Sequence, residues 1–111
     1  MTAIFIDDEM KYVVVIKGTG EEVMLTEPCS QNSDDIYHRD IVETNKQSLG
    51  TGYKVAGGGR IVINRIAKEI IAFDTSGRFG PARTEVVTRI LKKAMKETFN
   101  DWQLKVKDTI N

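Results

Sequence analysis

Residues 11–17, K-Y-V-V-V-I-K, decide the fold of this chain. Between its two lysines the stretch is apolar and rich in β-branched side chains, the pattern of a strand that is covered on both faces. Gly18 and Gly20 predict a turn directly after it, and residues 21–26 can return as the partner strand of a hairpin. The sequence therefore predicts a β-sheet with other elements packed on both of its faces.

Two amphipathic helices are predicted outside this hairpin. Residues 33–49 repeat apolar side chains at helical spacing, with Ser33 as the N-cap and Gly50 after the end. Residues 81–99 form two adjacent apolar rows after Pro81, which suits the first position of a helix. The 111 residues thus form a single α/β domain of about six strands and two helices. Further strands are predicted at residues 3–6, 53–56, 60–66, 68–73 and 102–107.

Composition and charge exclude several classes of protein. The net formal charge of zero and the isoelectric point near 6.6 argue against a broad nucleic-acid-binding surface. No apolar run approaches the roughly 20 residues that a membrane-spanning helix needs, and the N-terminal residues lack the features of a signal peptide. Cys29 is the single cysteine, so no internal disulfide is expected. We expect a cytoplasmic monomer that binds neither nucleic acid nor membranes.

Three consecutive glycines, Gly57 to Gly59 in V-A-G-G-G-R-I-V-I, interrupt strand-forming sequence. Ordering each glycine costs backbone entropy, and a glycine offers the sheet no side chain to pack. In a structural interpretation, the glycines form a bulge or a sharp corner between two strands. In a functional interpretation, their N–H groups approach an anionic ligand closely. The residues alone leave both interpretations open.

Two further features are candidates for chemistry. His38, the single histidine, is either half-buried in the core or a general base or nucleophile, because imidazole titrates near neutral pH. The segment D-T-S-G-R-F-G-P-A-R-T-E, residues 74–85, joins a strand to a helix and offers free N–H groups to an anion. It lacks the P-loop pattern, so it does not indicate a nucleotide site.

Clustered acidic residues raise the question of a metal site. They are predicted to be solvated residues of turns and helix starts, and the sequence therefore predicts no bound metal and no cofactor. The residues are Asp7, Asp8, Glu9, Asp34 and Asp35.

Four short motifs link the chain to a known family: K-Y-V-V-V-I-K, Y-H-R-D-I, G-G-G-R-I and F-G-P-A-R. With these motifs in the same order and at similar spacing, residues 11–107 resemble the phosphohistidine phosphatases of the Janus/Ocnus family. The resemblance implies a small, metal-independent domain with a mixed six-stranded sheet flanked by two helices. That architecture agrees with the order of elements predicted from the residues.

The resemblance also implies site residues. It puts His38 at the position of the family's catalytic histidine and Lys11 at that of its substrate-binding lysine. Arg60 falls on an arginine near the active site. We expect Gly57 to Gly59 to turn the chain tightly at the sheet edge and so to aim Arg60 at this site.

A phosphoryl-binding loop is implied as well. Ser76, Gly77 and Arg78 fall on the loop whose backbone holds the phosphoryl group in the family. Gly77 and Arg78 depart from the family pattern, and Arg78 adds a cation beside the pocket.

The implied activity is hydrolysis of the P–N bond of phosphohistidine in proteins or peptides, with His38 as a general base that activates water. Covalent catalysis through phospho-His38 is one alternative, and a non-catalytic phosphate-binding regulatory domain is another. The sequence identifies neither the target protein nor whether phospholysine is also a substrate.

Overall fold

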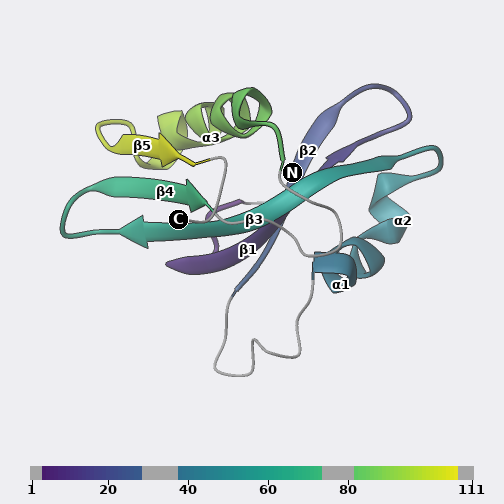
Figure 1. The fold of residues 1–111 in the computed structure, drawn as a ribbon, viewed down its shortest axis with the longest axis horizontal. Coiled ribbons are helices and arrows are strands. Elements are labelled where there is room, and N and C mark those ends of the chain that lie inside the picture. The colour runs from purple at the N-terminus through teal and green to yellow at the C-terminus, as the bar shows by residue number, and fades with distance from the viewer. Residues whose placement is uncertain (1–3, 29–37, 74–81, 108–111) are drawn as a thin grey trace.

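The computed structural model describes residues 4–28, 38–73 and 82–107 (Figure 1). These residues form an α+β fold with one mixed sheet, one main helix and two short helices. In chain order the elements are β1 (Glu9–Ile16), β2 (Glu22–Pro28), α1 (His38–Thr44), α2 (Lys46–Leu49), β3 (Lys54–Asn64), β4 (Glu69–Phe73), α3 (Thr84–Thr98) and β5 (Gln103–Val106).

The sheet of the described residues has five strands in the order β2-β1-β3-β4-β5. All neighbouring strands are antiparallel except β4 and β5, which are parallel because α3 connects them. The predicted hairpin of β1 and β2 is confirmed, and β1 lies in the interior of the sheet. The predicted α/β (α+β) fold with a single mixed sheet is confirmed. Among the described residues the sheet has five strands where about six were predicted, since residues 53–56 and 60–66 belong to the single strand β3 and residues 4–6 form no strand.

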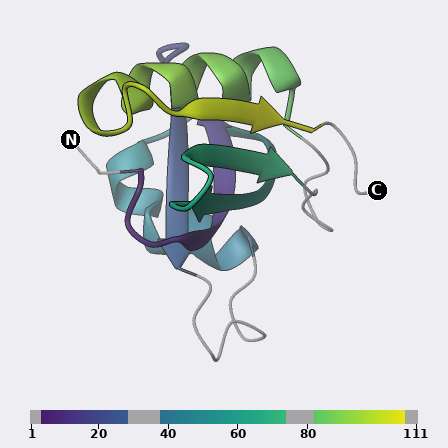
Figure 2. The same cartoon turned by 90° about the vertical axis from the view of Figure 1, so that its left-hand side faces the viewer.

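Helices cover both faces of the sheet (Figures 1 and 2). Strand alternation divides the core accordingly, because successive side chains of one strand point to opposite faces. On the α3 face the core includes Met10, Tyr12, Val14, Met24, Ile61, Ile63, Ile70, Ala72, Val87, Leu91, Met95 and Phe99. On the face of α1 and α2 it includes Val13, Val15, Leu25, Ile41, Val42 and Leu49.

The predicted helix over residues 33–49 is interrupted in the structure. Residues 33–37 lie outside the described residues, and Asn45 separates α1 from α2. The Asn45 side chain donates a hydrogen bond to the carbonyl oxygen of Ile41 at 2.7 Å, and its backbone N–H is shared between the carbonyls of Ile41 and Val42. An asparagine that bonds local backbone groups in this way competes with regular helical pairing.

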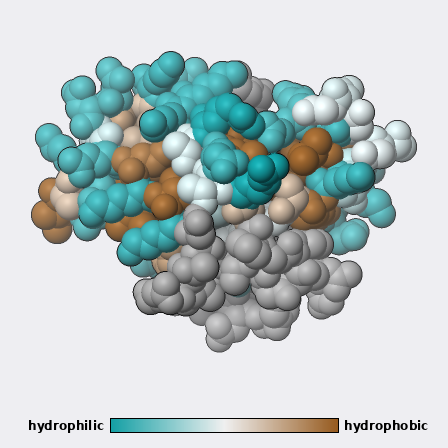
Figure 3. Space-filling model, turned by 45° about the horizontal axis from the view of Figure 1, so that its top comes forward, coloured by the Kyte–Doolittle hydropathy of each residue, from teal (hydrophilic) through white to brown (hydrophobic). Residues whose placement is uncertain are grey.

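The second helix is confirmed as α3, with bounds close to those predicted. Val87, Leu91 and Met95 are buried, and the neighbouring apolar row is half-buried. The opposite side of α3 presents lysines and other polar residues to solvent, and hydrophilic residues dominate this part of the surface in Figure 3. Helix α3 begins at Thr84, and the two residues before Thr84 are not helical. Pro81, the predicted first residue of this helix, lies outside the described residues.

The three glycines lie inside β3, a central strand, and not at a turn on the sheet edge as we expected. Val14 pairs with Gly57 whereas Val15 pairs with Val55, so β3 carries one extra residue at this point. This irregularity is a β-bulge, and Gly57 adopts a φ of 144°, which is a conformation that favours glycine. The structural interpretation as a bulge is therefore confirmed, and Arg60 is aimed by strand alternation.

Gly59 makes room for its neighbours on both sides. A Cβ atom at this position would lie 2.5 Å from the carbonyl oxygen of Phe73 and 2.9 Å from the ring of Tyr12. Tyr12 is the residue that pairs with Gly59, and it is only 3% exposed. The absence of a side chain here allows β4 and the tyrosine ring to approach β3 closely.

Replacing Gly59 by alanine should therefore destabilise the protein. The added methyl group must push away a backbone carbonyl of the neighbouring strand, and overpacking of this kind costs about 1–3 kcal/mol. The free energy of unfolding in urea measures the loss. Lys92→Ala, on the exposed side of α3, is the control and should change the free energy of unfolding by less than about 0.5 kcal/mol. A loss for Gly59→Ala no larger than that for Lys92→Ala would contradict the packing role.

Candidate functional site

A row of four paired residues crosses the sheet on the α1 face. Lys11 of β1 pairs with Glu27 of β2 on one side and with Arg60 of β3 on the other. Arg60 in turn pairs with Phe73, the last residue of β4. Directly opposed residues in antiparallel strands hold their Cβ atoms about 4.5–5.5 Å apart on the same face. Two cations, one carboxylate and one aromatic ring therefore stand side by side.

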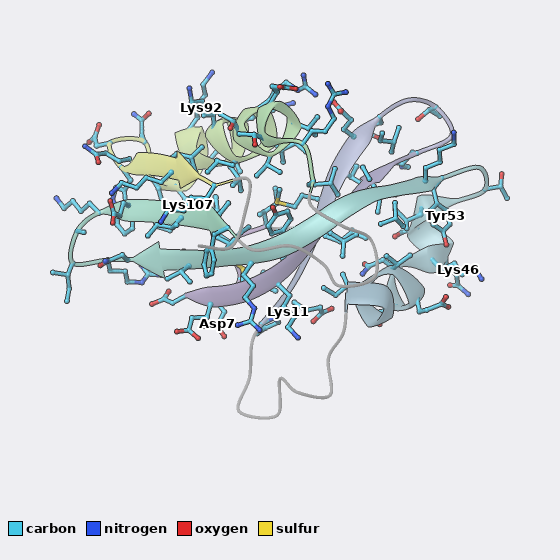
Figure 4. The ribbon with its side chains drawn as sticks, viewed as in Figure 1. Asp7, Lys11, Lys46, Tyr53, Lys92 and Lys107 are labelled. Atoms are coloured by element: carbon cyan, nitrogen blue, oxygen red, sulfur yellow. The ribbon has the colours of Figure 1, made fainter. Side chains whose placement is uncertain are left out.

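Lys11 is the buried member of this row. It is 9% exposed, whereas lysine is rarely buried in proteins. Val13 and Val15, which follow on the same face of β1, are completely buried under α1 and α2. In Figure 4 the Lys11 side chain projects from β1 beside the start of α1. Arg60, by contrast, is exposed.

A shallow pocket of about 160 Å³ opens beside Arg60. Four of its lining residues project onto the α1 face by strand alternation: Glu9, Arg60, Val62 and Phe73. Met10 and Ile61 complete the lining. Val62 and Phe73 are half-buried, so the pocket combines a partly apolar floor with a cation and a carboxylate.

The charges of the row favour an anionic ligand. Lys11 and Arg60 put two positive charges in directly opposed positions on one sheet face. An arginine fork and a lysine ammonium group both bind the oxygens of phosphate-like anions through strong, charge-assisted hydrogen bonds. The arrangement can therefore hold a tetrahedral oxyanion and stabilise negative charge that develops on it.

The structure brings together only part of the set of residues predicted as the site. Lys11 and Arg60 are neighbours, and His38 is the first residue of α1, which packs against β1 and β2 on the same face. The structure describes the backbone of His38 but not its side chain. Ser76, Gly77 and Arg78 lie outside the described residues, in the segment that follows Phe73 directly.

Sequence reasoning missed three members of this surface. Glu9 was predicted to be a solvated turn residue, but it begins β1 and lines the pocket. Glu27 and Phe73 were not predicted as site residues, because no motif or pattern in their own segments distinguishes them. Only the register of β2, β1, β3 and β4 places them in the row, and a single sequence contains no signal for that register.

The remaining acidic residues of the described parts of the chain form no cluster that could bind a metal ion. Asp8 forms an ion pair with Arg65 at 2.9 Å, and its carboxylate accepts the Nε–H of Arg65, which raises the pKa of the arginine. Across residues 4–28, 38–73 and 82–107, no group of three or more potential metal ligands comes together. Within the same ranges no helix is long and apolar enough to span a membrane.

The fold and the row of charges define a small α+β domain with two opposed cations on one sheet face. Comparison with protein families identifies the domain more closely. Residues 2–101 match the Janus/Ocnus family, and the chain belongs to this family, which includes phosphohistidine phosphatases. A comparison with curated proteins found no match.

Proposed function

We propose that this protein hydrolyses the P–N bond of phosphohistidine in proteins or peptides. The observation that carries the proposal is the pair Lys11 and Arg60, opposed on one sheet face beside a pocket. A phosphoryl dianion bound beside the two cations could accept charge-assisted hydrogen bonds from both of them. Membership of the Janus/Ocnus family supports the same activity, because phosphohistidine phosphatases belong to it.

In the proposed reaction, a water molecule attacks phosphorus in line with the P–N bond. His38, at the start of α1, takes a proton from that water as a general base. A P–O bond forms while the P–N bond breaks, and the electron pair of the P–N bond stays on the ring nitrogen of the substrate. Lys11 and Arg60 stabilise the charge that builds up on the phosphoryl oxygens. Backbone N–H groups of residues 76–78 complete the phosphoryl site in this proposal.

Release of inorganic phosphate from a phosphohistidine peptide tests the proposed function. We expect release well above the protein-free rate, and we expect EDTA to leave the rate unchanged because the proposed steps use only side chains and water. A phosphoserine peptide of the same sequence is the control and should stay intact, since its P–O ester lacks a leaving group that protonation makes labile. Activity that disappears with EDTA and returns with magnesium would move the chemistry to the carboxylates.

A further inference from the structure

Two residues of the pocket beside Arg60 have no role in the reaction as proposed above: Glu9 and Phe73. We propose that these residues bind the imidazole ring of the substrate, and that Glu9 holds this ring in its protonated form. The inference rests on the proposed function and concerns the leaving group, whereas Lys11 and Arg60 concern the phosphoryl group. It makes Glu9 a determinant of specificity for phosphohistidine over other phosphoramidates.

The register of the sheet gives the pocket two ends of opposite charge. Glu9 pairs with Val62, and Arg60 stands two residues before Val62 on the same face of β3. Diagonal neighbours of this kind lie about 7–8 Å apart. Phe73 pairs directly with Arg60, so the aromatic ring stands at the cationic end and half-buried Val62 forms the floor. Phosphohistidine matches this order of groups. Its anionic phosphoryl group, on one ring nitrogen, faces Arg60, and its other ring nitrogen, when protonated, faces Glu9.

Glu9 is exposed, but its backbone is held firmly. The Ile63 N–H donates a hydrogen bond to the carbonyl oxygen of Asp8 at 2.8 Å, which extends the pairing of β1 and β3 past Glu9. The Asp8 carboxylate is bound by Arg65, whose Nε lies 3.0 Å from Oδ1. The guanidinium of Arg65 also stands over the ring of Phe99, with 5.8 Å to the ring centroid. The segment that leads into Glu9 is therefore fixed at two points, to Ile63 of β3 and to Arg65 just after β3.

Glu27 is a less suitable partner for the ring than Glu9. It pairs with Lys11 from the side of β2, opposite to the side on which Arg60 stands. The pocket is lined by Glu9 and not by Glu27. A phosphoryl group held by Lys11 and Arg60 therefore has Phe73 on the side of β4, away from Glu27, and Glu9 two residues along β1 from Lys11.

Protonation of the ring decides how easily it leaves. In phosphohistidine one ring nitrogen carries phosphorus, and the other can carry a proton. A carboxylate that accepts a hydrogen bond from this N–H favours the protonated ring, and the face of an aromatic side chain attracts the resulting cation. When water attacks phosphorus, the P–N bond breaks and its electron pair stays on the ring nitrogen. The ring then leaves as neutral imidazole, without needing a further proton.

The experiment compares two substrates that share the P–N bond, a phosphohistidine peptide and phosphoramidate, which has no ring. For Glu9→Gln we expect kcat/KM on the phosphohistidine peptide to fall about tenfold, because hydrogen bonds to charged groups contribute more than neutral ones. On phosphoramidate we expect no fall. A general electrostatic effect of the substitution would raise kcat/KM, because removing a negative charge near two cations favours binding of a dianion. A fall in kcat/KM therefore cannot be such an effect. Glu97→Gln, on the exposed side of α3, is the matched control.

Each outcome assigns the failure to one of the two proposals. Wild-type protein that hydrolyses phosphohistidine, together with a Glu9→Gln variant that is equally active on it, would overturn the role of Glu9 alone. An equal fall on both substrates would also overturn it, because the effect would then lie on the phosphoryl group. Wild-type protein that hydrolyses neither substrate would overturn the proposed function itself, and the inference with it.

Discussion

Replacing His38 by alanine should lower kcat for phosphohistidine hydrolysis by about 10²–10⁴-fold, the usual contribution of a general base. The expected loss is large because His38 is the only imidazole of the chain, and no other side chain has an unperturbed pKa so near neutrality. KM should change little, since the proposed phosphoryl contacts come from Lys11, Arg60 and the backbone of residues 76–78 and not from His38. Steady-state kinetics on a phosphohistidine peptide measure both constants.

Two controls separate catalysis by His38 from support of the fold. The unfolding midpoint of His38→Ala should stay close to that of the wild type, and added imidazole should restore part of the activity. Activity within a few-fold of the wild type would contradict every catalytic role of His38.

Rapid-quench experiments without acid distinguish the two chemical routes, because a nucleophilic His38 would carry stoichiometric phosphate during a single turnover whereas a general base would not.

Replacing Lys11 by methionine should lower kcat/KM by about 10²–10³-fold, the cost of removing one donor that stabilises developing charge on an oxyanion. Methionine keeps much of the length of lysine but carries no charge. Methionine suits the buried place beside Val13 and Val15, but it removes the interactions of the ammonium group, and Glu27 stands directly opposite Lys11. The expected result is therefore a folded protein of lower stability with little activity, and the unfolding midpoint is measured beside the kinetics.

Lys17→Met is the matched control for this variant. Lys17 follows β1 directly and forms an ion pair with Glu21 at 3.5 Å, a partly exposed contact of the kind that contributes about 0–1 kcal/mol. Its replacement should leave kcat/KM within about twofold, because it lies at the far end of the strand. Equal losses for the two lysine variants would show that general electrostatic attraction, and not a placed phosphoryl contact, accounts for the effect.

Most of the fold could be predicted from the sequence because its elements have strong periodic patterns. The apolar residues of β1 and the two rows of α3 identified both elements directly. The glycine run misled the prediction, because glycine also tolerates an extended strand and a bulge, and pairing with β1 decides between these outcomes. The break at Asn45 was equally hidden, since it involves local hydrogen bonds from Asn45 to the carbonyl groups of Ile41 and Val42.

The candidate site was less accessible to sequence reasoning than the fold. Lys11 and Arg60 were assigned to the site through family resemblance, and the structure shows that they are cross-strand partners. Glu9 looked like one more acidic turn residue, because strand register decides which side chains share a face and a shift of one residue reverses it. His38 is placed only by its backbone at the start of α1, and the role of its side chain stays a prediction.

The most direct test of the central claim is a ³¹P NMR time course of a phosphohistidine peptide with the wild-type protein and with a Lys11→Met, Arg60→Met double variant, both in EDTA. The account predicts that the phosphohistidine signal converts to that of inorganic phosphate with the wild type. With the double variant it should decay at nearly the protein-free rate, while circular dichroism shows a folded protein. Equal rates for the two proteins, or no conversion by the wild type, would contradict the claim that this pair of cations forms a phosphohistidine-hydrolysing site.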